Sequence, residues 1–264
     1  MRKTLIASAV IGALAIPAIA LAEDAPAAAP APSPFTGNMN FASEYLYRGI
    51  AQTRGNPALQ GGFDYAHPSG FYVGTWGSNI SWISDTGIGT ASLEWDVYGG
   101  YKGTAGPIGY DVGVLTYNYP GNHKPSADGA KPDTQEVYGA LTWEWLTVKY
   151  SYTLGSLFGW TKNNDGHTKT SGSGYLEANA NFDLGNGWGV YGHAGHQSVN
   201  GYGKASYADF KVGGTKDIGI GVVGAGISTT NAKDSCNTSP TEPYCMGGYE
   251  AGKTRLFVTF GKTF

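Results

Sequence analysis

The chain has 264 residues, enough for one large domain or two small ones. Its formal net charge of −3 does not suggest a nucleic-acid-binding protein, because such proteins usually carry a strong basic excess. Glycine (42) and aromatic residues (18 Tyr, 10 Phe and 7 Trp) are abundant, whereas only 14% of residues are charged. Glycine weakens helices and aromatic side chains suit pleated sheets, so this composition favours strands and tight turns.

The N-terminal segment 1–22 predicts a secretory signal peptide. Arg2 and Lys3 form a positive region, residues 5–19 are mostly apolar, and Ala20-Leu21-Ala22 is a small-x-small cleavage site. We expect cleavage after Ala22; the alternative is that the segment remains as a membrane anchor.

Residues 23–35 are rich in Ala and Pro and are predicted to be a linker, which leaves residues 36–264 as the folded domain. After Ala22 no run of about 18 apolar residues appears, so no transmembrane helix is expected. An exported chain without a transmembrane helix is a periplasmic protein, an extracellular protein or a β-barrel in the membrane.

Apolar and polar residues alternate along much of this domain, which is the pattern of strands with one apolar face. The segment 146–154 is an example, with Leu146, Val148 and Tyr150 on one face and Lys149 on the other. The predicted strands are residues 38–48, 58–66, 71–80, 93–102, 108–119, 135–143, 146–154, 175–184, 188–196, 207–215, 218–228 and 254–264.

The connections between these strands alternate in length. The short ones are residues 67–70, 103–107, 144–145, 185–187 and 216–217. The long ones are residues 49–57, 81–92, 120–134, 155–174, 197–206 and 229–253. Bacterial outer-membrane barrels have short periplasmic turns and longer extracellular loops. The sequence therefore predicts an all-β protein, a closed antiparallel transmembrane β-barrel of about 12 strands in the bacterial outer membrane.

Aromatic residues near the predicted strand ends are expected to form girdles at the membrane interfaces. The candidates are Tyr47, Trp76, Trp143 and Trp188. In the last segment Leu256, Val258, Phe260 and Phe264 share one face. This arrangement resembles the signal by which the barrel-assembly machinery recognises its clients, so that machinery is an expected partner. The alternative is an ordinary edge strand.

Charged residues on the polar faces should point into the lumen, because charge facing lipid is costly. These candidate lumen-lining residues are Glu44, Arg48, Asp64, Glu94, Asp96, Lys102, Asp111, Lys149, Glu177, Asp209, Lys211 and Arg255. The acids outnumber the bases, so an open pore would weakly prefer cations. Glu44 and Arg48 are expected to pair, which would leave Glu94 and Asp96 as the main cation-attracting feature.

The two cysteines, Cys236 and Cys245, lie in one long connection and are expected to form a disulfide in an exported protein; two free thiols are the alternative. His193 and His196 are three residues apart and should occupy opposite faces of a strand, so they do not predict a metal site. The G-x-G-x-x-G pattern at 219–224 lies in a strand candidate that no helix follows, so no cofactor is expected.

The first half of the chain carries motifs of a known family. They are S-E-Y-L-Y-R-G-I-A-Q-T at 43–53, P-A-L-Q-G-G-F-D-Y-A at 57–66, G-F-Y-V-G at 70–74, E-W-D-V-Y-G-G-Y at 94–101 and Y-P-G at 119–121. In these segments the sequence resembles the TorF-family putative porins of Gram-negative bacteria. The resemblance implies an outer-membrane barrel with a pore role, and it supplies no site residues.

Three classes of function are open at this point. The first is a porin-like channel for passive diffusion of small hydrophilic solutes. The second is a structural or adhesive barrel with a plugged lumen, in which the inward charged residues form ion pairs with one another. The third, an outer-membrane enzyme, is not favoured, because no G-x-S-x-G nucleophile elbow is present. The expected partners are outer-membrane lipid and small solutes, not nucleic acid.

Overall fold

The computed structural model describes residues 33–123, 131–237, 239 and 241–264. The predicted signal peptide and most of the predicted linker lie outside the described residues. Within the described part, no helix is long and apolar enough to cross a membrane.

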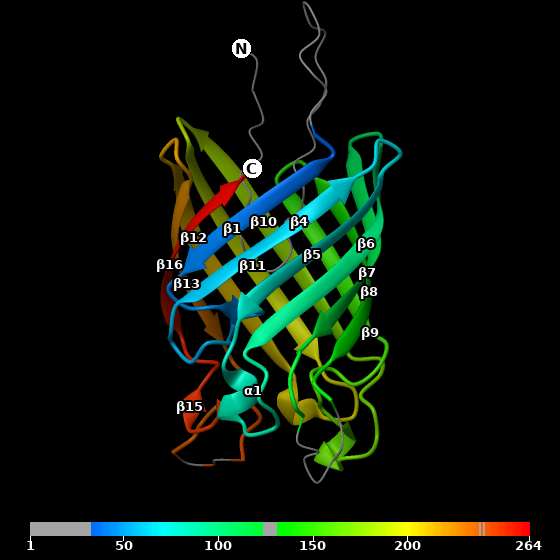
Figure 1. Ribbon diagram of the computed structural model, residues 1–264, viewed down its shortest axis with the longest axis vertical. Coiled ribbons are helices and arrows are strands. Elements are labelled where there is room, and N and C mark those ends of the chain that lie inside the picture. The colour runs from blue at the N-terminus through cyan, green and yellow to red at the C-terminus, as the bar shows by residue number, and fades with distance from the viewer. Residues whose placement is uncertain (1–32, 124–130, 238, 240) are drawn as a thin grey trace, which may run out of the picture.

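Among the described residues, twelve strands close into one antiparallel barrel (Figure 1). They are β1 (Phe35–Ala42), β4 (Ala58–Ala66), β5 (Phe71–Asn79), β6 (Leu93–Ala105), β7 (Ile108–Asn118), β8 (Thr134–Trp143), β9 (Leu146–Thr153), β10 (Gly174–Gly185), β11 (Trp188–Ser198), β12 (Tyr207–Asp217), β13 (Val222–Thr230) and β16 (Arg255–Thr263). The last strand pairs with the first, with Phe41 opposite Phe260, so no strand edge of the ring is left open. The predicted fold class is confirmed.

The largest differences between predicted and observed strand boundaries are in two segments, and the other boundaries differ by three residues or fewer. The segment 38–48 leaves the barrel wall after Ala42, and the chain then forms a hairpin of β2 (Leu46–Tyr47) and β3 (Ile50–Ala51). The segment predicted to begin at Ile218 begins at Val222 instead, because residues 218–221 form the turn from β12.

The connections sort by length to the two ends of the barrel. All connections at one end are short turns, and we call this the short-turn end. The opposite, long-loop end carries α1 (Trp82–Asp85), η1 (Lys162–Asn164), η2 (Gly203–Ala205), β14 (Cys245–Met246) and β15 (Tyr249–Glu250). In Figure 1 the short turns are at the top, and α1 and β15 are at the bottom. The predicted alternation of short turns and long loops is therefore present in the structure.

The outer face of the wall is strongly apolar. Alternating side chains such as Phe63 (73% exposed), Val212 (58%) and Leu256 (82%) point away from the barrel. Trp143 and Trp188 are also exposed, and both lie beside short turns, where an aromatic girdle was expected.

Two of the girdle predictions are wrong. Tyr47 lies in the β2–β3 hairpin, which folds inward, and is only 8% exposed. Trp76 shares the inward face of β5 with Ser78 and packs edge-on against Tyr45, with 5.6 Å between the ring centroids. In each case the side chain contributes to the interior instead of the rim.

The inner face changes from buried to accessible along the barrel. On β6 the inward residues nearest the long loops, Glu94 and Asp96, are 2% and 5% exposed. Lys102, farther along the same strand, is partly exposed, and Thr104 is exposed. Strand β10 shows the same trend from buried Tyr175 to exposed Asn181. The lumen is thus filled near the long loops and accessible to water near the short turns.

Two glycines of β11 provide a matched test of inward and outward packing. A Cβ at Gly195 would overlap the hydroxyl of Tyr175 and lie 2.7 Å from Asp209 Oδ2, whereas a Cβ at Gly192 would meet nothing within 4 Å. We expect Gly195→Ala to lower the free energy of unfolding by about 1–3 kcal/mol, because it overpacks the filled half. Gly192→Ala should be neutral. Urea titration of the folded barrel measures both, and equal effects would contradict this assignment of faces.

Candidate functional site

The most unusual feature of the interior is the segment 43–57, which connects β1 to β4 and which we call the inner hairpin. Its two-residue turn consists of Arg48 (φ 46°) and Gly49 (φ 78°). Two positive φ values in succession are the conformation of a type I′ turn, where Asn-Gly is favoured. Gly49 suits this backbone, whereas Arg48 adopts it at an energetic cost. The contacts of the Arg48 side chain explain why an arginine occupies this position.

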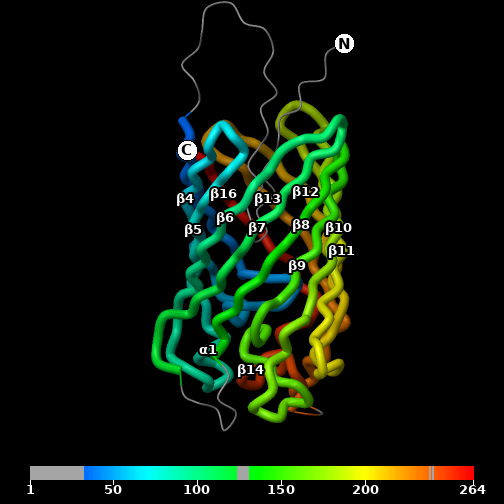
Figure 2. The backbone as a smooth tube through the Cα atoms, turned by 90° about the vertical axis from the view of Figure 1, so that its right-hand side faces the viewer, coloured from blue at the N-terminus to red at the C-terminus, as the bar shows by residue number. Residues whose placement is uncertain are grey.

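Arg48 reaches three strands on the far side of the barrel. Its guanidinium donates two hydrogen bonds to Glu136 of β8, at 3.1 and 2.7 Å, and one to Gln197 Oε1 of β11, at 2.8 Å. It also lies over the rings of Tyr175 of β10 (4.2 Å) and Tyr47 (4.9 Å). In the order of strands around the ring, these walls are opposite β1 and β4, where the inner hairpin is rooted. The inner hairpin therefore spans the lumen, as Figure 2 shows for the blue segment.

Further contacts join the inner hairpin to β6, β7 and β12. Tyr45 donates a hydrogen bond to Glu94 of β6 at 2.7 Å, and Tyr47 donates one to Tyr117 of β7 at 2.6 Å. A Cβ on Gly49 would lie 2.8 Å from the Asp209 Cβ of β12, so the tip touches that wall closely. The inner hairpin is the main filling of the long-loop half of the lumen.

The base of the inner hairpin is bound to the last long loop, residues 231–254. The Ala51 N–H donates to the Ala251 carbonyl at 2.9 Å. The Tyr249 hydroxyl and the Gly55 N–H both donate to Glu44 Oε1, at 3.0 and 2.8 Å. The same loop carries the Cys236–Cys245 disulfide and the short β14–β15 ladder. The disulfide is thus placed in the loop that holds the hairpin's base.

A second polar cluster lies beside the hairpin tip. His193 Nε2 is 2.8 Å from Asp209 Oδ1, and the Tyr175 hydroxyl donates to Asp209 Oδ2 at 2.9 Å. His193 Nδ1 lies 2.7 Å from Asn179 Oδ1 and 3.7 Å from Glu177 Oε2. Every ring nitrogen of His193 therefore has a partner, and His193 faces the lumen while His196 is exposed on the outer face.

Tyrosine hydroxyls also bind the carboxylates of the water-accessible half. Tyr98 donates to Asp64 at 2.6 Å, and Tyr72 donates to Asp111 at 2.5 Å. Lys149 makes a cation–π contact in the same half, with its Nζ 4.2 Å from the ring centroid of Tyr138. This half of the lumen is polar and carries charges of both signs.

The structure places all twelve candidate lumen-lining residues toward the interior. Glu44 and Arg48 do so from the inner hairpin, and the others do so from the inward faces of the barrel strands. The expected pair of Glu44 and Arg48 is wrong: Arg48 binds Glu136, and Glu44 lies 3.9 Å from Arg255. The physical reason is that Arg48 extends across the lumen while Glu44 stays at the hairpin's base.

Sequence reasoning missed Glu136, the carboxylate that binds Arg48. Glu136 alternates with Gln135 and Val137 and shares the inward face of β8 with Tyr138, so period-2 alternation could have identified it. Of the proposed assembly signal, Leu256, Val258 and Phe264 are exposed on the outer face and Phe260 is partly buried there. Their recognition by the barrel-assembly machinery stays a prediction.

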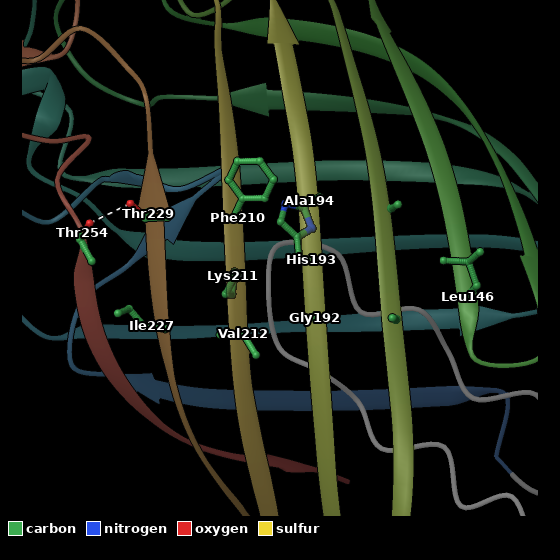
Figure 3. Close-up of a pocket in the computed structure, with 12 residues that line it drawn as sticks. Leu146, Gly192, His193, Ala194, Phe210, Lys211, Val212, Ile227, Thr229 and Thr254 are labelled. Carbon is green, nitrogen blue, oxygen red and sulfur yellow. Dashed lines mark hydrogen bonds between the residues drawn. The ribbon is translucent and has the colours of Figure 1, made fainter.

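A groove of about 580 Å³ lies on the outer wall, not in the lumen (Figure 3). Its floor is formed by Ala178, Ala180, Gly192 and Ala194, between the larger side chains of Leu146 and Phe210 and others. Small side chains on the outward faces of β10 and β11 create it. The groove therefore offers no path through the barrel.

The sequence matches the model of a protein family over residues 26–264, and the family is described as "Bacterial protein of unknown function (Gcw_chp)". The chain belongs to this family. A search of the curated proteins finds no match.

Among solved structures, the chain is similar to two porins and to an outer membrane protein. The KdgM porin in complex with disordered oligogalacturonate has a TM-score of 0.49 at 7% identity, with 87% of this chain and 98% of that chain covered. The NanC porin has a TM-score of 0.44 at 10% identity, with 87% and 98% covered. Acinetobacter baumannii Omp33 has a TM-score of 0.41 at 9% identity, with 87% and 97% covered. Identities this low identify no residue of this chain as the counterpart of a functional residue in those proteins.

The disulfide can be tested together with its local role. We expect both cysteines to resist alkylation unless a thiol reductant is added, as read by mass spectrometry. In Cys236→Ser/Cys245→Ser the loss of stability should be on the order of 2–3 kcal/mol at most, because the closed loop is short. Limited proteolysis should then cut within residues 231–254 while the barrel stays folded. Alkylation of both cysteines without reductant would show that the bond is absent.

Proposed function

We propose that the protein is an outer-membrane porin-like channel that passes small hydrophilic solutes, of the kind that the TorF-type resemblance implies. The observation that carries this proposal is the reversal of polarity across the wall. The outer face is apolar, whereas the inner face of the same strands carries carboxylates, lysines and hydroxyl groups. A polar lumen enclosed by an apolar outer face supports a role in transport.

The apolar outer face supports a membrane location. Side chains such as Phe63, Phe71, Leu141, Val212 and Leu256 are at least half exposed and lie all around the barrel. Soluble monomers rarely expose an apolar surface of such extent. A closed ring also satisfies its backbone hydrogen bonds internally, as hydrocarbon requires. Export and cleavage after Ala22 belong to the same proposal.

The lumen charges support a weak preference for cations. When Glu136 is added to the twelve candidate lumen-lining residues, this set has eight carboxylates against five lysines and arginines. Arg48 is neutralised by Glu136, so it adds little positive field to the constriction. Acidic side chains around a pore favour cations, and the small excess should be screened by salt.

The second candidate is a structural or adhesive barrel with a plugged lumen. The filling by the inner hairpin favours it, because the inward residues Glu136, Ser151 and Asp209 are each 1% exposed. The two candidates differ in whether ions cross the barrel.

We expect the purified protein to produce stable single-channel current steps in planar lipid bilayers, because polar residues line the lumen at every level. The steps should be small, since the inner hairpin restricts the path. Heat-unfolded protein is the control. Electrically silent insertion, demonstrated by protease protection in vesicles, would favour the plugged barrel instead.

The carboxylates Glu94 and Asp96 test the selectivity. Glu94→Gln/Asp96→Asn replaces two carboxyl groups of the constricted region with neutral amides and should shift the reversal potential in a salt gradient toward anions. Gln keeps an acceptor oxygen for one of the two hydroxyls, Tyr45 and Tyr119, that now donate to the two carboxylate oxygens of Glu94. Glu144→Gln, an exposed short-turn variant, should leave the potential near the wild-type value. An unchanged potential in the double variant would mean that these residues do not border the ion path.

A further inference from the structure

The inner hairpin is not needed to hold the barrel together. Strand β1 pairs directly with β4 along its length, from Phe35 opposite Tyr65 to Ala42 opposite Ala58. The hairpin's own strands β2 and β3 pair with each other and form a sheet separate from the barrel. The inner hairpin could therefore leave the lumen without breaking any strand pair of the wall.

The hairpin's base and tip are held differently. Directly after the tip, backbone hydrogen bonds link the Ala51 N–H to the Ala251 carbonyl and the Ser81 N–H to the Gln52 carbonyl. At the base, the Gly55 N–H donates to Glu44 Oε1, and none of these bonds reaches across the lumen. At the tip, the strongest contact is the ion pair of Arg48 with Glu136, whose side chains are 8% and 1% exposed. The base is thus suited to act as a hinge, and the ion pair fastens the free end.

The identity of residue 48 is informative because its backbone disfavours arginine. Asn would be the better residue at φ 46° before a glycine with positive φ. Arginine supplies the planar fork that binds one carboxylate through two nitrogens, and Glu136 is bound in that way. Removing one partner of a buried ion pair leaves the other charge without compensation, which strongly disfavours the closed arrangement.

We propose that the inner hairpin is a removable plug and that the Arg48–Glu136 ion pair is its latch. When the latch is broken, the hairpin moves toward the long-loop end and widens the narrow path between the water-accessible half of the lumen and that end. This inference rests on the proposed channel function for its effect on conductance, but the movement of the hairpin can be measured independently.

The test uses three variants of the full chain: Glu136→Gln, Arg48→Asn, and the two combined. Arg48→Asn keeps the turn in a favourable backbone conformation, so its effect reports the lost ion pair and not a misfolded hairpin. Glu177→Gln is the matched control for the labelling readout, because Glu177 is a lumen carboxylate whose partners are Asn179 and His193 and not the inner hairpin. Retention of the folded barrel is checked by its shift in electrophoretic mobility on heating.

Two readouts are taken in vesicles and bilayers. The first is the rate at which a water-soluble maleimide labels Ile50→Cys, a position beside the tip that is 3% exposed in the wild type. The second is single-channel conductance. Breaking the latch should raise the labelling rate at least about tenfold, because an unpaired buried charge shifts the population toward the released state. Conductance should rise in the same variants, and Glu177→Gln should leave the labelling rate at the wild-type value.

The outcomes separate the two proposals. Faster labelling without any current would support the plug and overturn the channel. Wild-type current with labelling and conductance unchanged in all three latch variants would support the channel and overturn the latch. If Glu177→Gln accelerates labelling as much as Glu136→Gln does, the effect belongs to lumen charge in general, and the specific latch is overturned.

Discussion

The whole molecule depends on the pairing of β16 with β1, which closes the ring. Closure supplies a partner for the backbone groups at what would otherwise be two open strand edges. It also fixes which face of each strand is inside, because side chains alternate along every strand. An apolar exterior and a polar interior then follow from one alternating pattern. Side chains just fill the interior of an eight-stranded ring, and the diameter grows with strand number. In this twelve-stranded ring the inner hairpin occupies one half of the interior.

The polar interior creates a second constraint, because buried carboxylates need hydrogen-bond donors. Tyrosine supplies them repeatedly: Tyr45 and Tyr119 bind Glu94, Tyr98 binds Asp64, Tyr72 binds Asp111 and Tyr175 binds Asp209. A tyrosine also fills space with its ring, so one residue type meets both needs. This accounts for part of the high tyrosine content. Among the described residues, Asp96 Oδ1 is buried without such a partner.

The sequence predicted the strands of the barrel wall well, but it did not predict the inner hairpin that fills half of the lumen. Alternation and turn residues are local signals, so residues 58–66 were predicted with the boundaries that the structure has. Alternation also continues through Tyr45 and Tyr47, and nothing local distinguishes a hairpin inside the barrel from a strand in its wall. The partners of Arg48 are 88 and 149 residues away in the chain. Only the closed ring brings Glu136 and Gln197 close to Arg48, so the ion pair could not be predicted from the sequence.

The pairing of the first strand with the last has a consequence for the order of assembly. Asn38 is opposite Thr263, so the ring cannot close until nearly the whole chain is available. Contacts between residues so distant in sequence form slowly, because a long loop must be closed first. The inner hairpin follows directly after the first strand, whereas its partners on β8, β11 and β12 come later in the chain. Insertion of the hairpin must therefore be coordinated with ring closure, and the nascent barrel must keep residues 43–57 on its inner side while the seam is still open.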